Sequence, residues 1–407
     1  MAGSAAEVRR LGSRRIGPIV PLTWYSTPKK RFLLGALGLF VRVFLPRRVS
    51  ARPDRAQNEA VSSILVLELW NIGDIILAMP FLAQLRGLFP RARITLLSRS
   101  FAEDLLAGTG LVDEFIPADL NWTEGNRFRL SGKTIDFWQV SRKLRRQRFD
   151  LAFASRAHVR EHFLLALSRA GRRVGYALGK HDAALTDSIA PGDAQGHKVG
   201  DWMRLLEPFG GAITLQQPRL HIDESERMWS KGYLSSRGVG KDDLLVGFHP
   251  GASVVEKRWP LERFREVTTA TAAQPGVRVL AFAEPSGYGS ELFAIPGVVG
   301  AQVGLRELMA LIERCDLLVC NDSGPMHIAG ALGVPTVAMF GPGVEHWFAP
   351  LGGGHEILRP DQDKPLPDQD SGRQEIRTPR EIRSSQVLEA VERAVQRLRG
   401  GGTFSGV

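Results

Sequence analysis

Residues 319–342 constrain the fold more than any other stretch, because their pattern predicts a strand, a polar turn, a helix and a second strand. The apolar run 317–319 is typical of a buried parallel strand. Residues 321–324 are small and polar and cap the following helix, which ends at Gly333. Residues 334–340 predict the next strand. Parallel strands joined by a helix form a βαβ unit, so we expect an α/β fold.

The start of this helix is also a candidate ligand site. A helix that begins at the carboxyl end of a parallel strand presents free backbone N–H groups and the positive end of its dipole. These groups suit a phosphate or diphosphate, bound near Ser323 and Gly324. Many α/β proteins contain such a unit, so this segment alone leaves the function open.

Residues 244–264 form a second informative segment. Residues 244–248 predict a strand, and the loop after it contains Gly251, where a ligand can approach the backbone closely. Lys257 follows, and Pro260 suits the first turn of a helix. Lys257 is interpreted either as a cation for a phosphate or as a solvated loop charge.

Residues 63–97 form the third segment. Residues 64–69 and 94–97 predict two strands of another βαβ unit, and Gly73 and Asp74 lie at the turn between the first strand and its helix. Asp74 is interpreted either as a group that faces a ligand or only as a capping carboxylate at the helix start.

Together, the three segments resemble the family-9 glycosyltransferases, the bacterial heptosyltransferases of lipopolysaccharide core assembly. The resemblance spans roughly residues 61–350. The matching residues are Gly73, Asp74, Pro80, Phe89 and Pro90; His249, Pro250, Gly251, Lys257, Arg258, Trp259 and Pro260; and Asn321, Asp322, Ser323, Gly324, Pro325, Met326, His327, Gly333, Val334, Pro335, Thr336, Phe340, Gly341 and Pro342.

The resemblance implies two Rossmann-like domains that face each other across a cleft, an arrangement known as GT-B. It also implies an inverting transfer of heptose from ADP-heptose to a lipopolysaccharide core or related cell-surface glycan, with no metal and no other cofactor. Residues 343–347 depart from the usual family pattern, so the donor's class is better supported than its identity.

Within this family pattern, Asp74 matches the catalytic base and Lys257 is the cation for the leaving diphosphate. Asp74 lies at a helix start, and the helix dipole there favours its ionised form. The donor-binding residues expected are Gly251, Ser253, Glu284, Asp322, Ser323, Gly324, Met326 and His327. Arg156, His158 and Arg160 are expected to contact the acceptor, because the corresponding helix start lies near the acceptor cleft in the family.

The charge of the chain is concentrated at its beginning. Residues 1–60 contain twelve Lys or Arg and three acidic residues, so nine of the ten net positive charges lie there. The nearly neutral remainder argues against a nucleic-acid-binding surface and for a basic N-terminal arm. Cys315 and Cys320 flank an apolar strand and suit buried free thiols in a reducing cytoplasm, rather than a disulfide or a metal site.

Within the arm, residues 32–45 are apolar but include Arg42, and they are too few to span a bilayer. They lie too far along the chain for an ordinary signal peptide. Flanking basic residues suit an interfacial anchor on the anionic cytoplasmic face of the inner membrane, which would make the protein cytoplasmic and peripheral. The alternatives are packing against the first domain or a poorly ordered start.

We expect a domain organisation with five parts. The resemblance alone implies that the last helix crosses back to the first domain. A long loop of Gly, Asp, Pro and His is expected over residues 179–201. The parts are the arm at 1–60, an acceptor domain at 61–220, a connector at 221–243, a nucleotide-sugar domain at 244–383 and a C-terminal helix at 384–399.

Two motifs suggest a metal but have simpler explanations. His158, Glu161 and His162 match an inverted zinc-protease pattern, without an obvious further ligand downstream. Residues 361–363 and 368–370 are both Asp-Gln-Asp, but they lie in a polar, proline-rich stretch that no strand precedes. We expect a flexible loop there and no bound metal.

Three other functions remain to be distinguished. The same fold could use another nucleotide sugar, or a protein or capsule acceptor. A non-catalytic scaffold that binds nucleotide sugars is less consistent with Asp74, Lys257 and Asp322 occurring together. A dehydrogenase is disfavoured because no Gly-x-Gly-x-x-Gly follows a predicted strand.

Overall fold

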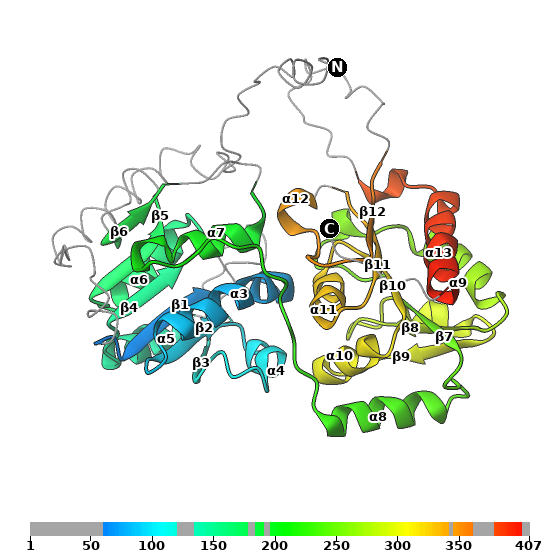
Figure 1. Cartoon of the computed structure of the whole chain (residues 1–407), viewed down its shortest axis with the longest axis horizontal. Coiled ribbons are helices and arrows are strands. Elements are labelled where there is room, and N and C mark those ends of the chain that lie inside the picture. The colour runs from blue at the N-terminus through cyan, green and yellow to red at the C-terminus, as the bar shows by residue number, and fades with distance from the viewer. Residues whose placement is uncertain are drawn as a thin grey trace, which may run out of the picture.

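The computed structural model describes residues 60–119, 134–177, 184–190, 196–341, 345–360 and 378–400. In this part, the chain forms two parallel six-stranded sheets with helices on their faces (Figure 1). The α/β prediction with two Rossmann-like units is therefore confirmed. The arm and both Asp-Gln-Asp motifs fall outside the described residues, apart from the last residue of the arm.

The first sheet has the strand order β3-β2-β1-β4-β5-β6. Its strands are β1 (Ser63–Glu68), β2 (Arg93–Ser98), β3 (Glu114–Pro117), β4 (Leu151–Ala154), β5 (Arg172–Tyr176) and β6 (Asp187–Ile189). The chain moves outward in one direction from β1 and then in the other from β4, so β1 and β4 flank a topological switch point. Ligands of such sheets bind beyond the carboxyl ends of the strands at this point.

The second sheet repeats this plan, with the order β12-β11-β10-β7-β8-β9. Its strands are β7 (Leu244–His249), β8 (Val277–Phe282), β9 (Val298–Ala301), β10 (Leu317–Asn321), β11 (Thr336–Met339) and β12 (His355–Leu358). Here β7 and β10 flank the switch point. The loop that contains Lys257 follows β7, and the polar turn before His327 follows β10, so both reach the same edge of the sheet.

Helices connect the strands of both sheets. Those of the first half are α3 (Ile72–Leu88), α4 (Ala102–Leu106), α5 (Thr134–Arg146), α6 (Val159–Leu167) and α7 (Lys198–Arg204). The others are α8 (Glu224–Ser235), α9 (Leu261–Ala272), α10 (Leu305–Glu313), α11 (Gly324–Leu332), α12 (Glu345–Phe348) and α13 (Ser384–Arg399), with 3-10 turns at Glu207–Phe209, Val255–Lys257, Ser290–Ala294 and Pro379–Glu381.

Both faces of the central strands are buried. Ile64 and Val66 of β1 face one apolar cluster with α3 and α7, and Leu65 and Leu67 face another with α5 and α6. All four side chains are essentially unexposed. A strand covered on both faces is apolar throughout, which explains the continuous hydrophobic runs in the sequence.

The two halves also share an apolar core. The cluster that contains Ile75 and Met79 of α3 continues into Met326 and Ile328 of α11. Helices α3 and α11 therefore pack against each other, and each begins at the switch point of its own sheet. This packing brings the two candidate ligand-binding edges face to face.

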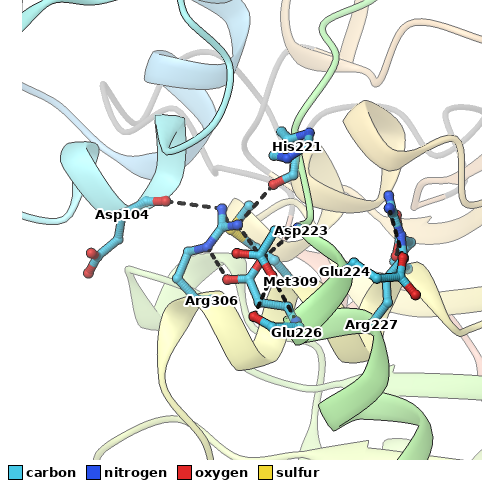
Figure 2. A network of polar contacts seen from close by, with 10 residues as sticks. Asp104, His221, Asp223, Glu224, Glu226, Arg227, Arg306 and Met309 are labelled. Carbon is cyan, nitrogen blue, oxygen red and sulfur yellow. Dashed lines mark hydrogen bonds and ion pairs between the residues drawn. The ribbon is translucent and has the colours of Figure 1, made fainter.

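A polar network also joins the two halves of the chain (Figure 2). Arg306 of α10 donates to Glu226 of α8 and, from Nη2, to the His221 carbonyl oxygen at 3.0 Å. Its Nη1 donates to the carbonyl oxygen of Asp104 in α4 at 3.2 Å. One guanidinium thus joins the first half, the connecting segment and the second half.

Two expectations about the fold are wrong. Residues 179–201 are not one loop, because they include the short edge strand β6 and the start of α7 at Lys198. Strand β6 is short and mostly polar, so its sequence lacks the apolar pattern that predicts a strand. It forms through its pairing with β5. Helix α13 does not cross to the first half, because its apolar residues Val387 and Val391 are buried in the cluster of α9 and the second sheet.

Among the described residues, no helix is both long enough and apolar enough to cross a bilayer. Both cysteines are buried and free, as predicted.

Candidate functional site

The helix starts of α3 and α11 meet at the centre of the candidate site. A Cβ atom on Gly73 would lie 2.4 Å from Cδ2 of His327, so only glycine allows this approach. A Cβ on Gly324 would lie 3.1 Å from Cβ of Ile72. The free N–H groups and positive dipole ends of both helices are therefore directed at one region between the sheets.

Asp74 lies in the first turn of α3 and is 9% exposed. Its Oδ2 accepts the backbone N–H of Asn71 at 3.2 Å, so it does cap the helix, as one interpretation of the sequence held. Its Oδ1 also accepts Nη2 of Arg156 at 2.5 Å. Each carboxylate oxygen has a second lone pair, so both partners can orient the group and still leave it able to accept another proton donor.

The charge state of Asp74 follows from these contacts. Burial alone would raise the pKa of its carboxyl, but Arg156, the Asn71 N–H and Lys198 outweigh that effect and hold the pKa below its ordinary value. Asp74 is therefore ionised at neutral pH. It can accept a proton, although Arg156 reduces its basicity.

His327 lies between the candidate groups of the two halves. Burial lowers the pKa of its imidazole to about 4, against the opposing effects of Asp322 and Asp74, and Lys257 adds to the lowering. The ring is therefore neutral at physiological pH and can donate or accept a hydrogen bond without contributing charge.

Lys257 and Asp322 form an ion pair on the second half. The Lys257 Nζ lies 2.6 Å from Oδ2 of Asp322, whose side chain is only 4% exposed. The Lys257 side chain is 28% exposed, so its ammonium is held in place but remains accessible. Lys257 is thus not a freely solvated loop charge.

Gly251 and Glu284 lie side by side, farther along the same edge of the second sheet. A Cβ on Gly251 would lie 2.4 Å from Oε1 of Glu284, whose Oε2 accepts Nη2 of Arg258 at 2.9 Å. The Arg258 guanidinium also lies over the ring of Tyr288, 4.2 Å from its centroid. Arg258 was not among the predicted site residues, although it follows Lys257 directly.

The loop after β7 is attached to the end of β10 by one buried amide. Asn321 accepts the Trp259 backbone N–H with Oδ1 at 3.0 Å and donates from Nδ2 to the Pro250 carbonyl oxygen at 2.7 Å. This attachment places Lys257 beside Asp322.

The remaining predicted donor residues differ in accessibility. Ser253 is exposed at the tip of the loop, and Ser323 and Gly324 are partly exposed at the start of α11. Ser323 directs its Oγ to the Asn321 carbonyl oxygen at 3.2 Å and makes no side-chain cap, which leaves the helix N–H groups for a ligand. Met326 has no exposed surface and packs in the core beneath the loop.

Of the predicted acceptor residues, Arg156 pairs with Asp74, and His158 lies within interaction range of Arg156 and Arg160. Arg156 follows β4, and His158 and Arg160 are at the start of α6, all partly buried. Burial lowers the pKa of His158 to about 4, and Arg160 and Arg156 contribute. The His158 ring meets the Trp70 ring edge to face, with 6.1 Å between centroids.

Sequence reasoning missed a group of charged residues around Asp74. Burial is the main reason that the pKa of Glu68 rises to about 8 and that of Glu161 to about 7, and Asp74 raises both further. Lys198, 8% exposed, lies in the same region. Glu68 could have been noticed in the sequence as an acidic residue at the end of an otherwise apolar strand. No feature of the sequence marks Lys198.

The residues of the inverted zinc-protease pattern have other contacts. Glu161 accepts the Trp70 indole N–H at 2.8 Å, and His162 is buried. No group of three or more His, Cys, Asp or Glu with metal-binding geometry occurs in the part of the chain that the structure describes.

Comparison with solved structures shows which class of protein has this fold. The structure resembles a family-9 glycosyl transferase from Veillonella parvula, with TM-score 0.68 and 25% identity over 82% of this chain and 97% of that one. It also resembles the E. coli ADP-heptose LPS heptosyltransferase II, with TM-score 0.64 and 20% identity over 83% of this chain and 99% of that one. The chain therefore has the GT-B fold of a glycosyltransferase.

Sequence comparison identifies the family. The model described as glycosyltransferase family 9 (heptosyltransferase) matches residues 137–376, more than half of the chain. Lipopolysaccharide heptosyltransferase 2 of Salmonella typhimurium is 27% identical over 320 residues, which cover 73% of this chain and 87% of that protein. The chain belongs to glycosyltransferase family 9 and is a glycosyltransferase.

Proposed function

We propose that this enzyme transfers a heptose from ADP-heptose to a lipopolysaccharide core or related glycan, with inversion and without a metal. The observation that carries the proposal is the meeting of α3 and α11, which brings Asp74 and the Lys257–Asp322 pair together around His327. The names of the family and of its Salmonella relative support heptose as the sugar. The name of the E. coli structural neighbour supports ADP-heptose as the donor.

In the proposed reaction, an acceptor hydroxyl oxygen attacks the anomeric carbon of the heptose from the side opposite the leaving group. The bond from that carbon to the diphosphate oxygen breaks, and ADP leaves with the electron pair. Asp74 accepts the hydroxyl proton, a role that suits an ionised carboxylate at the first sheet's switch point. Arg156, His158 and Arg160 are proposed to hold the acceptor beside it.

The donor site is proposed to lie on the second sheet. Lys257 and the N–H groups at the start of α11 balance the charge that develops on the leaving diphosphate, so no metal is required. Asp322 orients Lys257, and the Glu284 carboxylate accepts hydrogen bonds from the ribose hydroxyls. Gly251 allows the nucleotide to approach the backbone, and Ser253 lies at the rim of the site.

A lipid-linked acceptor would bring the enzyme to the cytoplasmic face of the inner membrane. The positive charge of residues 1–60 supports a peripheral contact of the arm with anionic lipids. The proposal places no nucleic acid among the partners.

The donor is tested by thermal unfolding with ADP, UDP, GDP or CMP, each with and without EDTA. A nucleotide at about a hundred times its dissociation constant adds about 2.7 kcal/mol to the free energy of unfolding. We expect ADP to give the largest rise in Tm, unaffected by EDTA and lost in Lys257→Ala. A selective UDP or GDP response would assign another donor, and a response to none of the four would contradict a nucleotide-sugar site.

The candidate base is tested with Asp74→Asn, which keeps the shape of the side chain but removes its basicity. We expect kcat to fall by roughly 10²–10⁴-fold, the usual contribution of a general base, while the ADP dissociation constant stays the same. Glu103→Gln, which changes an exposed acid of α4, is the matched control. Near-normal turnover by Asp74→Asn would remove this residue from the chemistry.

A further inference from the structure

We propose that Glu161 is a positioning residue for sugar transfer, because it holds the Trp70 indole and so fixes the Arg156 guanidinium on the Asp74 carboxylate. The inference rests on the proposed role of Asp74 as the base. Glu161 is the acid of the His-x-x-Glu-His pattern, and this role requires no metal. Glu161 touches no reacting atom and acts only through Trp70 and Arg156.

The first link joins Arg156 to Asp74. Arg156 lies on the loop after β4, and its Nη2 donates to Oδ1 of Asp74 at 2.5 Å. The Arg156 side chain is 28% exposed and has several rotatable bonds. A long, partly exposed side chain keeps a single orientation only where further contacts restrain it.

Trp70 supplies that restraint. Cζ of Arg156 lies 4.1 Å from the Trp70 ring centroid, a distance typical of a cation–π contact. Trp70 occupies the turn between β1 and α3, only four residues before Asp74. The ring can hold Arg156 in one orientation only while its own side chain is fixed.

Glu161 fixes the ring. Its Oε1 accepts the Trp70 Nε1–H at 2.8 Å, and the residue is 2% exposed in the first turn of α6. A carboxylate in the first turn of a helix is itself stabilised by the dipole. The helix therefore fixes Glu161, Glu161 fixes Trp70, Trp70 fixes Arg156, and Arg156 orients the candidate base.

The surrounding charges determine how pH acts on this chain of contacts. Glu68, Asp74 and Glu161 are buried within interaction range of Arg156 and Lys198. The titratable and charged groups that face the cluster are Glu68 of β1, Asp74 of α3, Arg156 and His158 before α6, Arg160 and Glu161 of α6, Lys198 of α7 and His327 of α11. Loosening Arg156 removes the main effect that lowers the pKa of Asp74, so that pKa must rise.

The test compares Glu161→Ala with Glu161→Gln. The alanine variant loses the acceptor for the indole N–H, whereas the amide oxygen of glutamine can still accept it. For Glu161→Ala, we expect kcat to fall by up to about a hundredfold, the scale of a small misplacement, and the acid limb of kcat/KM to move to higher pH. Glu161→Gln should recover most of the rate without this upward shift, and both should bind ADP like the wild type.

Trp70→Phe provides a second variant if Glu161→Ala fails to fold. It keeps an aromatic ring beneath Arg156 but removes the N–H donor, so it should reproduce the upward shift of the acid limb. Glu103→Gln controls for the loss of an exposed acid. An unchanged pH profile in both Glu161→Ala and Trp70→Phe would overturn the proposal, as would equal losses in the alanine and glutamine variants.

A measurement without substrate separates this inference from the proposed function. Acrylamide quenching of Trp70, obtained by subtracting the Trp70→Phe signal, should increase in Glu161→Ala and stay near the wild-type value in Glu161→Gln. Unchanged quenching in Glu161→Ala would overturn the inference even if the wild type transfers heptose. A wild type that transfers no sugar would contradict the proposed function but leave the quenching result to decide the contact.

Discussion

At the scale of single residues, Glu68 shows how burial controls charge in this molecule. It ends β1 with a side chain that is 1% exposed, and its Oε1 accepts the Trp70 backbone N–H at 3.1 Å. Burial, reinforced by Asp74, raises its pKa to about 8. The folded protein therefore keeps a proton on Glu68 at pH values where the unfolded chain has lost it.

This difference predicts how stability depends on pH. Because the folded state binds more protons here, the stability attributable to Glu68 is full below pH 4.5 and declines until the pH passes about 8. We expect Glu68→Gln, which resembles the protonated acid, to stabilise the protein by a few kcal/mol at pH 9 and to have little effect at pH 4.5. Urea unfolding of both proteins at the two pH values tests this, and an equal effect at both would contradict the assignment.

At the scale of elements, the loop after β7 depends on the end of β10. Asn321 has no exposed surface, and its amide joins the backbones of Trp259 and Pro250. The hydrogen bonds within the loop, at the 3-10 turn Val255–Lys257 and from Arg258 to the Ala252 carbonyl oxygen, do not attach it to the sheet. The geometry of Lys257 and Asp322 is therefore determined by a contact between two segments about sixty residues apart.

Asn321→Ala should break this attachment. It would leave a buried N–H and a buried carbonyl oxygen without partners, at a cost of about 1–3 kcal/mol each. We expect a lower Tm and weaker ADP binding, because Lys257 loses its fixed position. Ser236→Ala, which removes an exposed side-chain hydrogen bond at the end of α8, is the control. If ADP bound Asn321→Ala with unchanged affinity, the loop would be positioned in some other way.

At the scale of the whole molecule, the contacts that hold the halves together include an apolar one and a polar one. The apolar contact between α3 and α11 lies at the candidate site, and the Arg306 network lies along the connecting segment (Figure 2). A polar contact can break and re-form at a lower cost than a buried apolar one. We therefore expect the Arg306 network to be the contact that opens first when the halves move relative to each other.

Arg306→Ala tests this expectation. Loss of the contacts to Glu226, His221 and Asp104 should lower the free energy of unfolding by roughly 1.5–3 kcal/mol and speed proteolysis in residues 212–220. Arg227→Ala is the matched control, since Arg227 joins α8 to Glu313 of α10 without reaching the first half. Equal proteolysis of both variants would contradict a role for Arg306 between the halves.

Much of the fold was predictable because its cause is local. The buried strands β1, β7 and β10 are apolar at nearly every position, and Gly333 ends α11 with a φ of 77°, where glycine is favoured. Strands β6, β9 and β12 were missed, because short edge strands contain too few residues to show a clear apolar pattern. The direction of α13 was wrong, because an apolar stripe predicts that a helix packs without specifying on what.

The sequence by itself determined the α/β class, the strand-to-helix turns that contain Asp74 and Ser323, and the presence of Lys257 on a loop after a strand. These depend on residues within a few positions of one another. Only the tertiary structure decided that Arg156 pairs with Asp74, that Glu161 holds Trp70, and that Gly73 meets His327. Burial and charge interactions between elements depend on distance in space, and the local sequence does not contain that distance.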